Sequence, residues 1–425
     1  MNRFRALVGS LVTVLVSAGL AASVVVAPPA GAAENLGWST LSRVTTNTQW
    51  AAGRLRGTAW GHGNLSMARN VGSTTFQGVT YGYASWDSPW VSPGRRFTEL
   101  VPSWTARTPN GTWLHVYVRV RTVDGRISRF KDMGSWSSSD QLFRRTSAGP
   151  QADAIARVAT DTLMSTGPAF NGYQFRIYLQ RRNGLDGRPA VTRSPTVLAL
   201  QAVVSRLPAR FPTTSRPLSS APVWLAVPRF SQMIHAGQDP QYGGGGEAWC
   251  SPTSLAMVVG YYGKLPPAWS YRWVPAGWPD RVVNEFARLT YDHGYAGNGN
   301  WPFNTALATA WLPDTFVTRL PDLRAAERLV RAGIPVIASI AFGRGELDRA
   351  PISATNGHLV VIVGFNRYGS PIVNDPAAPD NRTVRRTYDR GQFERAWLNG
   401  SGGLAYIVRD AAHPLPPRPA GLRAW

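Results

Sequence analysis

Alternating apolar and polar positions run through the first half of the chain. Leu114, Val116, Val118 and Val120 alternate with residues suited to a solvent-facing side, which is the period of a half-buried strand. A second alternation, at positions 173, 175, 177 and 179, repeats this pattern, and Asp124-Gly125 supplies a hairpin turn before a returning strand at 126–131. Trp104, Trp113 and Trp136 are large enough to fill the space between two sheets. The pattern predicts an antiparallel β-sandwich over residues 33–207.

In the second half of the chain, some apolar residues recur at the spacing of a helix and others form the runs of a strand. Apolar residues at helical spacing predict helices near 255–262, 282–289 and 323–330, the first and last ended by Gly263 and Gly333. Apolar runs at 335–342, 359–365 and 371–374 predict strands, the last two joined by a short hairpin loop. Helices that precede an antiparallel sheet predict an α+β domain over residues 223–412.

Three segments lie outside these two predicted domains. Arg3 and Arg5 precede an apolar run that ends before the small-residue site Ala30-Gly31-Ala32, which predicts a secretory signal peptide over residues 1–32. The alternative is an uncleaved membrane anchor. Residues 208–222 are rich in Pro, Ser and Thr and predict a linker. Residues 413–425 contain four prolines and predict a disordered tail.

Composition adds a charge bias but no defined partner. The formal net charge is +21, and nearly all the basic residues are arginines spread along the chain. Such a charge favours weak attraction to an anionic envelope polymer, and the β-sandwich is the part expected to contact it. No nucleic-acid-binding module is recognisable, so we expect no nucleic-acid partner. After cleavage of the signal we expect a protein outside the cell, without stable membrane insertion.

The chain contains one cysteine, Cys250. A lone cysteine cannot form an internal disulfide, and an exposed thiol outside the cell is open to oxidation, so a structural staple is excluded. Cys250 stands before Ser251 and Pro252 at the start of an apolar helix, with Ser251 as a candidate cap. A thiol at a helix N-terminus is favoured as the thiolate, which is the nucleophilic form. The alternative is a small buried core residue.

A nucleophilic thiolate needs a base within reach. Among six histidines, only His358 begins a strongly apolar strand, after the loop Thr355-Asn356-Gly357. A carboxylate or amide can then hold the imidazole in one tautomer. Asp375 follows the next strand and is the preferred candidate, while Asn374 is the rival because neighbouring side chains in a strand point to opposite faces.

These motifs occur in the order of a known family. Val227 to Gln232, Trp249-Cys250-Ser251-Pro252-Thr253-Ser254, Gly357-His358-Leu359-Val360-Val361 and Val373-Asn374-Asp375-Pro376 resemble the bacteriocin-processing, double-glycine-leader peptidases and their secreted relatives. The resemblance covers about half of the mature chain and implies a papain-like cysteine peptidase fold. It also implies that Gln232 donates to the oxyanion, Cys250 attacks, His358 is the acid and base, and Asp375 orients His358. The first half resembles, more weakly, the β-rich half of secreted actinobacterial members.

Two departures limit what the resemblance implies. Ser251 stands where the family usually has glycine, which predicts crowding beside the nucleophile. No transporter segments follow the catalytic domain, so a leader-peptide substrate is not implied.

The sequence therefore predicts a secreted bacterial cysteine peptidase that cleaves peptide or protein substrates through a covalent acyl-enzyme. Two alternatives remain: a cell-wall peptide hydrolase or acyltransferase that uses the same residues, and a non-catalytic binding protein on this scaffold. We expect no cofactor, and no ligand cluster with zinc spacing is present in the sequence.

Overall fold

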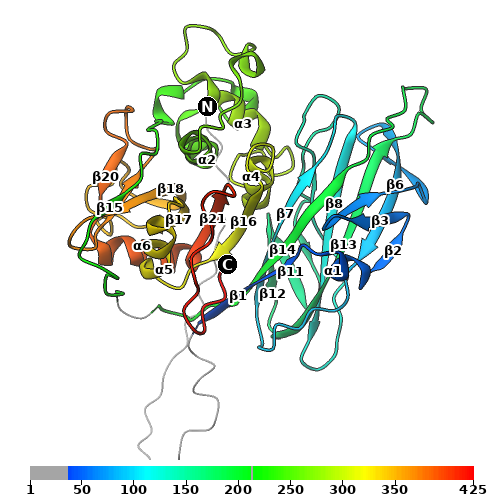
Figure 1. Cartoon of the computed structure of the whole chain (residues 1–425), viewed down its shortest axis with the longest axis horizontal. Coiled ribbons are helices and arrows are strands. Elements are labelled where there is room, and N and C mark those ends of the chain that lie inside the picture. Colours follow the sequence, from blue (N-terminus) through cyan, green and yellow to red (C-terminus); the bar gives the residue numbers. More distant parts are fainter. Residues whose placement is uncertain (1–36, 212–213) are drawn as a thin grey trace, which may run out of the picture. The chain divides into compact units, whose positions relative to one another are not determined.

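The computed structural model describes residues 37–211 and 214–425. Its first lobe is a sandwich of two antiparallel sheets (Figure 1). The first sheet has eight strands: β1 (Trp38–Val44), β3 (Thr58–Gly61), β4 (Asn64–Met67), β7 (Glu99–Arg107), β10 (Gln151–Ala152), β11 (Ala156–Ala159), β12 (Thr162–Ser165) and β14 (Thr196–Arg206). The second has six: β2 (Arg54–Arg56), β5 (Gly72–Phe76), β6 (Val79–Asp87), β8 (Thr112–Thr122), β9 (Lys131–Trp136) and β13 (Phe170–Arg182). A short helix, α1 (Asn47–Ala51), follows β1.

The two segments with predicted alternation are central strands of this sandwich. Positions 114–120 fall in β8 and positions 173–179 in β13, and these two strands pair along almost their whole length. Their inward residues enter one apolar core together with Trp104 and Trp136. The strand that returns after Asp124-Gly125 begins only at Lys131, because Gly125 closes a turn onto Thr122 and residues 126–130 make just one bridge, Arg121 with Ile127.

The second lobe is a seven-stranded antiparallel sheet with helices on both faces (Figure 1). Its path is β16-β21-β17-β18-β19-β20, and β15 pairs with β18. The strands are β15 (Val223–Trp224), β16 (Asp314–Arg319), β17 (Val336–Phe342), β18 (Thr355–Phe365), β19 (Pro371–Asn374), β20 (Arg385–Thr387) and β21 (Leu404–Arg409). The α-helices are α2 (Cys250–Tyr261), α3 (Arg281–Thr290), α4 (Trp301–Ala308), α5 (Leu323–Arg331) and α6 (Arg390–Ser401).

Burial on both faces explains the unbroken apolar run in β18. Leu359, Val361 and Val363 pack into the core shared with α2 and α3, whereas Val360 and Ile362 pack into the core shared with α5 and α6. The predicted α+β class is confirmed. The predicted order of helices before sheet is wrong in detail, because α5 lies between β16 and β17 and α6 between β20 and β21.

The two lobes share core residues within one compact unit, residues 37–425. Phe303 and Ala306 of α4 belong to the core of the sandwich, and the ring centroid of Phe303 lies 6.1 Å from that of Trp104. Gly134, at φ 122°, makes room for this contact, since a Cβ there would lie 2.8 Å from the Phe303 ring. Helix α4 of the second lobe is therefore part of the first lobe's core.

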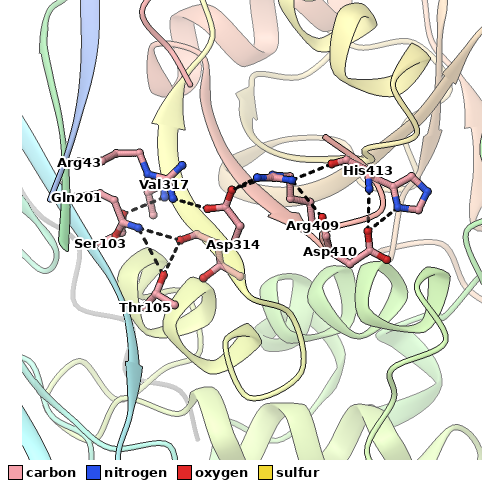
Figure 2. A network of polar contacts seen from close by, with 10 residues as sticks. Arg43, Ser103, Thr105, Gln201, Asp314, Val317, Arg409, Asp410 and His413 are labelled. Carbon is pink, nitrogen blue, oxygen red and sulfur yellow. Dashed lines mark hydrogen bonds and ion pairs between the residues drawn. The ribbon is translucent and has the colours of Figure 1, made fainter. Parts of the chain in front are cut away.

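Polar contacts border this shared core (Figure 2). Asp314 of β16 accepts from Arg43 of β1 and forms an ion pair with Arg409 of β21, whose Nη2 lies 2.6 Å from its Oδ2. The Thr105 hydroxyl of β7 donates to the Thr315 carbonyl at 3.3 Å. Strand β16 thus contacts both the sheet of its own lobe and the eight-stranded sheet of the sandwich.

The prediction of a disordered tail is wrong. Trp425 is only 7% exposed, its Nε1 donates to the Pro416 carbonyl at 2.9 Å, and the Ala424 carbonyl accepts from the Thr318 hydroxyl at 2.6 Å. The prolines signal an irregular chain, but the terminal tryptophan gives that chain enough apolar area to bind to the sheet.

The predicted linker also packs against the second lobe. Ser215 N and Oγ both donate to the Glu394 carboxylate at 2.6 Å, and Leu218 N donates to Glu327 at 3.0 Å. Both glutamates are buried, so the connecting segment supplies the hydrogen bonds that their carboxylates need.

The predicted signal peptide, residues 1–32, lies outside the described residues. Among the residues that are described, no helix combines the length and apolar character needed to cross a bilayer.

Candidate active site

Cys250 lies at the first position of α2, with Trp249 as the N-cap residue. The thiol is partly exposed, and the side chain of His358 and the backbone of Ser251 and Leu359 act on its pKa. The Ser254 hydroxyl of α2 donates to the Leu359 carbonyl of β18 at 3.0 Å, which joins the helix to the residue after His358. The start of α2 and strand β18 thus bring the predicted nucleophile and base together, although Cys250 and His358 are 108 positions apart in the sequence.

His358 is held from its other side by Asp375. The Nε2 atom of His358 lies 2.7 Å from Oδ1 of Asp375, and both side chains are almost completely buried. Because Asp375 occupies Nε2, the ring nitrogen left for the thiol is Nδ1. Asp375 follows β19, which pairs with β18, so the sheet itself brings the carboxylate beside the imidazole.

Two further donors fix the Asp375 carboxylate. The Tyr388 hydroxyl donates to its Oδ2 at 2.7 Å, and the Ala377 N–H donates to its Oδ1 at 3.0 Å. Tyr388 comes just after β20, and the pairing of β20 with β19 places it there. Sequence reasoning missed Tyr388, because no local pattern marks a tyrosine whose partner is set by strand pairing.

Asn374, the rival of Asp375, points elsewhere. Its Nδ2 donates to the Pro228 carbonyl at 2.9 Å and its Oδ1 accepts from Arg385 at 3.1 Å. Asn374 therefore holds the segment before Gln232 against the sheet.

Gln232 lies beside the turn that leads into the nucleophile. Its Nε2 donates to the Gly246 carbonyl at 2.8 Å, its N–H donates to the Pro376 carbonyl at 2.8 Å, and its buried Oε1 has no hydrogen-bond partner. Gln232 thus connects the turn after Asp375 with the 3₁₀ turn Gly246–Trp249 before Cys250.

The glycine run before this turn is structurally required. Gly243 to Gly246 all have positive φ, and a Cβ on Gly245 would lie 1.8 Å from the His235 carbonyl oxygen. His235 lies in the 3₁₀ turn Met233–His235. Its side chain is fully buried, 2.9 Å from Gln238 Oε1 and packed against the Trp249 ring, so burial lowers its pKa. His235 supports the turn that presents Cys250.

Ser251 does not cap α2 as predicted. No side-chain cap is present, and the buried Ser251 hydroxyl lies 3.0 Å from the Tyr406 hydroxyl of β21. This hydrogen bond satisfies a polar group that would otherwise be costly beside the nucleophile. Tyr406 was not found by sequence reasoning, because β21 carries no motif.

The electrostatics favour an ion pair. Burial alone would raise the pKa of the Cys250 thiol, but the hydrogen bond and charge of His358, with two backbone N–H groups, hold it below its usual value. Burial likewise acts to lower the pKa of His358, but the charge of Asp375, its hydrogen bond and the contact with Cys250 raise that pKa. The opposite shifts favour thiolate and imidazolium together at neutral pH.

One prediction concerns the pH dependence of alkylation. Iodoacetamide reacts with the thiolate, so its rate with Cys250 should rise with a midpoint below the free-cysteine value of about 8.5. His358→Ala removes the main cause of the lowered pKa and leaves burial, so its midpoint should move upward. Mass spectrometry of label incorporation across pH measures this, and every label reports on Cys250 because the chain has one cysteine.

The matched control is His62→Ala, since His62 is exposed in the sandwich. Its alkylation midpoint should equal that of the unaltered protein. An equal midpoint in His358→Ala and the unaltered protein would contradict the ion pair.

In the described part of the chain, no group of three or more His, Cys, Asp or Glu side chains has an arrangement suited to a metal ion. The site consists of a thiol, an imidazole, a carboxylate and an amide.

Two family models match the chain. The Peptidase C39 N-terminal domain matches residues 40–199, and the Peptidase C39-like family matches residues 224–404. The chain carries peptidase C39 family domains. The predicted family resemblance is confirmed, and the C39-like domain is papain-like, with the cysteine at a helix start against an antiparallel sheet. This membership indicates cysteine peptidase activity.

The similarity of this chain to solved structures is weaker than its match to the two family models. A prointerpain A fragment from Prevotella intermedia is 16% identical, with a TM-score of 0.28 over 50% of this chain and 78% of that one. A LamA variant from Zobellia galactanivorans, in complex with laminaritriose and laminaritetraose, is 11% identical, with a TM-score of 0.18 over 39% of this chain and 92% of that one. No curated protein matches the chain.

Proposed function

We propose that the protein is a secreted bacterial cysteine peptidase that hydrolyses peptide bonds with Cys250 as nucleophile, His358 as acid and base, and Asp375 as orienting group. The observation that carries the proposal is that Asp375 Oδ1 lies 2.7 Å from His358 Nε2, while His358 acts to hold the pKa of the Cys250 thiol below its usual value. Acyl transfer by a cysteine uses a thiolate that is stabilised by a neighbouring imidazolium. A buried carboxylate in turn orients that imidazolium.

In the proposed first step, the Cys250 thiolate attacks the carbonyl carbon of the substrate peptide bond. The Nδ1 proton of His358 passes to the leaving amine as the C–N bond breaks, and a thioester remains on Cys250. In the second step His358 accepts a proton from water, whose oxygen attacks the thioester. The acid is released, and the thiolate and imidazolium are restored.

Gln232 is the proposed side-chain donor to the oxyanion. Its Nε2 carries two N–H groups, and the Gly246 carbonyl accepts from Nε2 at 2.8 Å, so the amide is fixed in orientation before substrate binds. A preset donor of this kind stabilises developing charge without reorganisation. The backbone N–H groups at the start of α2 are the proposed second donor.

Secretion is part of the proposal and rests on the sequence of residues 1–32, with the arginines, apolar run and small-residue site described above. The proposed substrate is a peptide or protein outside the cell. Arginine excess gives the mature protein its positive charge, which favours retention near an anionic envelope.

The function is tested by cleavage profiling of a peptide library. The mature protein should generate new peptide termini, and the same protein treated with iodoacetamide should generate none. The reagent modifies the single cysteine, so the treated sample is a chemical knockout of Cys250. Identical profiles from treated and untreated protein would refute the peptidase.

A further inference from the structure

A pocket of about 480 Å³ lies on the six-stranded sheet of the sandwich, far along the sequence from the candidate active site. Its lining comes from β5, β6, β8 and β13 and from Phe130, just before β9. On β8, His115 and Tyr117 face the pocket while Leu114, Val116 and Val118 face the core, so the pocket occupies the outward face of this sheet. No residue of the proposed catalytic machinery lines it.

Three tyrosines form an aromatic row across the pocket. Tyr178 lies edge-to-face between Tyr83 and Tyr117, with ring centroids 5.5 and 5.8 Å away. All three side chains are partly exposed. A partly exposed tyrosine offers an apolar ring and a polar hydroxyl side by side, which suits a ligand that alternates C–H faces and hydroxyl groups.

The polar groups around this row are already fixed. His115 Nε2 lies 2.6 Å from Asp132 Oδ2, and His115 Nδ1 lies 3.1 Å from the Tyr117 hydroxyl. Gln180 also lines the pocket, is 2% exposed, and has a buried Oε1 without a hydrogen-bond partner. A buried acceptor without a partner is costly, and a hydroxyl donor that reached it would remove that cost.

One arginine, Arg176, lines the pocket, and Arg119 and Arg121 continue the outward side of β8 beyond it. Arg176 binds Asp87 with two hydrogen bonds of 2.7 Å, so that pair is neutral overall. Within residues 37–211 and 214–425, no ion pair joins Arg119 or Arg121 to a carboxylate, and the two donate to the side chains of Gln174 and Asn171. The surplus of guanidinium groups favours an anionic ligand.

These arginines are also held against aromatic rings. Arg119 and Arg176 lie 4.6 and 4.3 Å from the ring centroid of Phe130, and Arg119 and Arg121 lie 5.2 and 5.1 Å from that of Trp90. The stacking fixes the guanidinium groups in advance, which lowers the entropy cost of binding an anion.

We propose that this pocket binds a segment of an anionic polysaccharide, a chain of sugar rings that carry carboxylate or phosphate groups. The sugar rings pack along Tyr83, Tyr178 and Tyr117, and the acidic substituents pair with Arg119 and Arg121. The faces of Phe130 and Trp90 are already covered by guanidinium groups, which leaves the hydroxyl-bearing tyrosines for the ligand. That division favours a hydroxyl-rich ligand over stacked nucleobases.

The test is biolayer interferometry of the whole mature protein on immobilised polymers. The probes are polygalacturonate, which carries carboxylates, phosphomannan, which carries phosphates, a neutral mannan, polyphosphate and single-stranded DNA. At least one acidic glycan should bind about tenfold or more tightly than the neutral mannan and polyphosphate. The stronger of the two acidic glycans identifies the acidic group.

Variants then test whether glycan binding depends on the pocket and the arginines beside it. Tyr178→Ala and the double variant Arg119→Gln, Arg121→Gln should each weaken binding of that glycan about tenfold. The controls are Tyr368→Ala and Arg382→Gln, whose side chains are exposed on the second lobe, and they should bind like the unaltered protein. Tyr178→Phe keeps the ring and should retain most of the affinity, even if Tyr178→Ala disturbs the fold.

Three results would overturn the proposal. The first is equal binding of acidic glycan and polyphosphate, and the second is preference for single-stranded DNA. The third is unchanged affinity in both the Tyr178→Ala and the double arginine variants. Peptide cleavage by the same variants is measured in parallel, so failure of the glycan site is separate from failure of the proposed peptidase.

Discussion

Replacement of Cys250 by alanine should lower kcat for peptide cleavage by about 10⁴-fold or more, and so should replacement of His358 by alanine. The decrease in kcat of the double variant should be no larger than that of either single variant. The reason is that the proposed mechanism uses the two side chains as one unit. Without the thiol the imidazole has no nucleophile to activate, and without His358 the thiol loses both the cause of its lowered pKa and the acid for the leaving amine. Steady-state cleavage of a peptide substrate by the two single variants and the double variant measures this.

His62→Ala is the matched control, because it removes an exposed histidine of the sandwich and should keep full activity. Additive losses in the double variant would mean that Cys250 and His358 act independently, against the effect of His358 on the pKa of the thiol. Full cleavage by Cys250→Ala would refute the mechanism altogether.

Phe303→Ala should destabilise the whole described unit by about 3–5 kcal/mol, which is a large share of the stability of an ordinary domain. Phe303 belongs to a peptidase-side helix, yet its fully buried ring packs in the sandwich core against Trp104 and over Gly134. Its removal leaves a cavity that the sheets cannot close without moving α4. Denaturant unfolding, followed by tryptophan fluorescence and by loss of peptide cleavage, gives the change in free energy.

Both measurements should shift together, because the shared core makes the two lobes unfold as one unit. The control is Trp269→Ala, since that ring is 65% exposed and its loss should change stability by less than about 0.5 kcal/mol. A shift in fluorescence that leaves the midpoint of activity loss unchanged would mean that the second lobe is stable without this contact.

The catalytic candidates could be found in the sequence because their signals are local. A helix start beside Cys250 and an apolar strand after His358 are visible within about ten residues each, and the helical and strand periods located α2 and β18. The alternations at 114–120 and 173–179 identified β8 and β13 for the same reason. Family-like motifs then supplied Gln232 and the order of the site.

Other parts of the site depend on contacts that no local pattern encodes. Tyr388 meets Asp375 because β20 pairs with β19, and Tyr406 meets Ser251 because β21 lies beside the start of α2. The buried position of His235 depends on a turn of four glycines that closes over it. The two tyrosine contacts join segments whose distance in space is set by the whole sheet.

By itself, the sequence located the helices α2, α3 and α5, the strands β8, β13 and β18, the single thiol, and the histidine that precedes a buried apolar run. It could do so because periodicity and helix-start chemistry act over a few residues. Only the tertiary structure decided that Asp375 rather than Asn374 faces His358, that α4 enters the sandwich core, and that the terminal tryptophan anchors the tail. These outcomes follow from strand register and from burial between segments that are far apart in the sequence. A shift of the strand register by one residue would exchange the faces of Asp375 and Asn374, and Asn374 would then face His358.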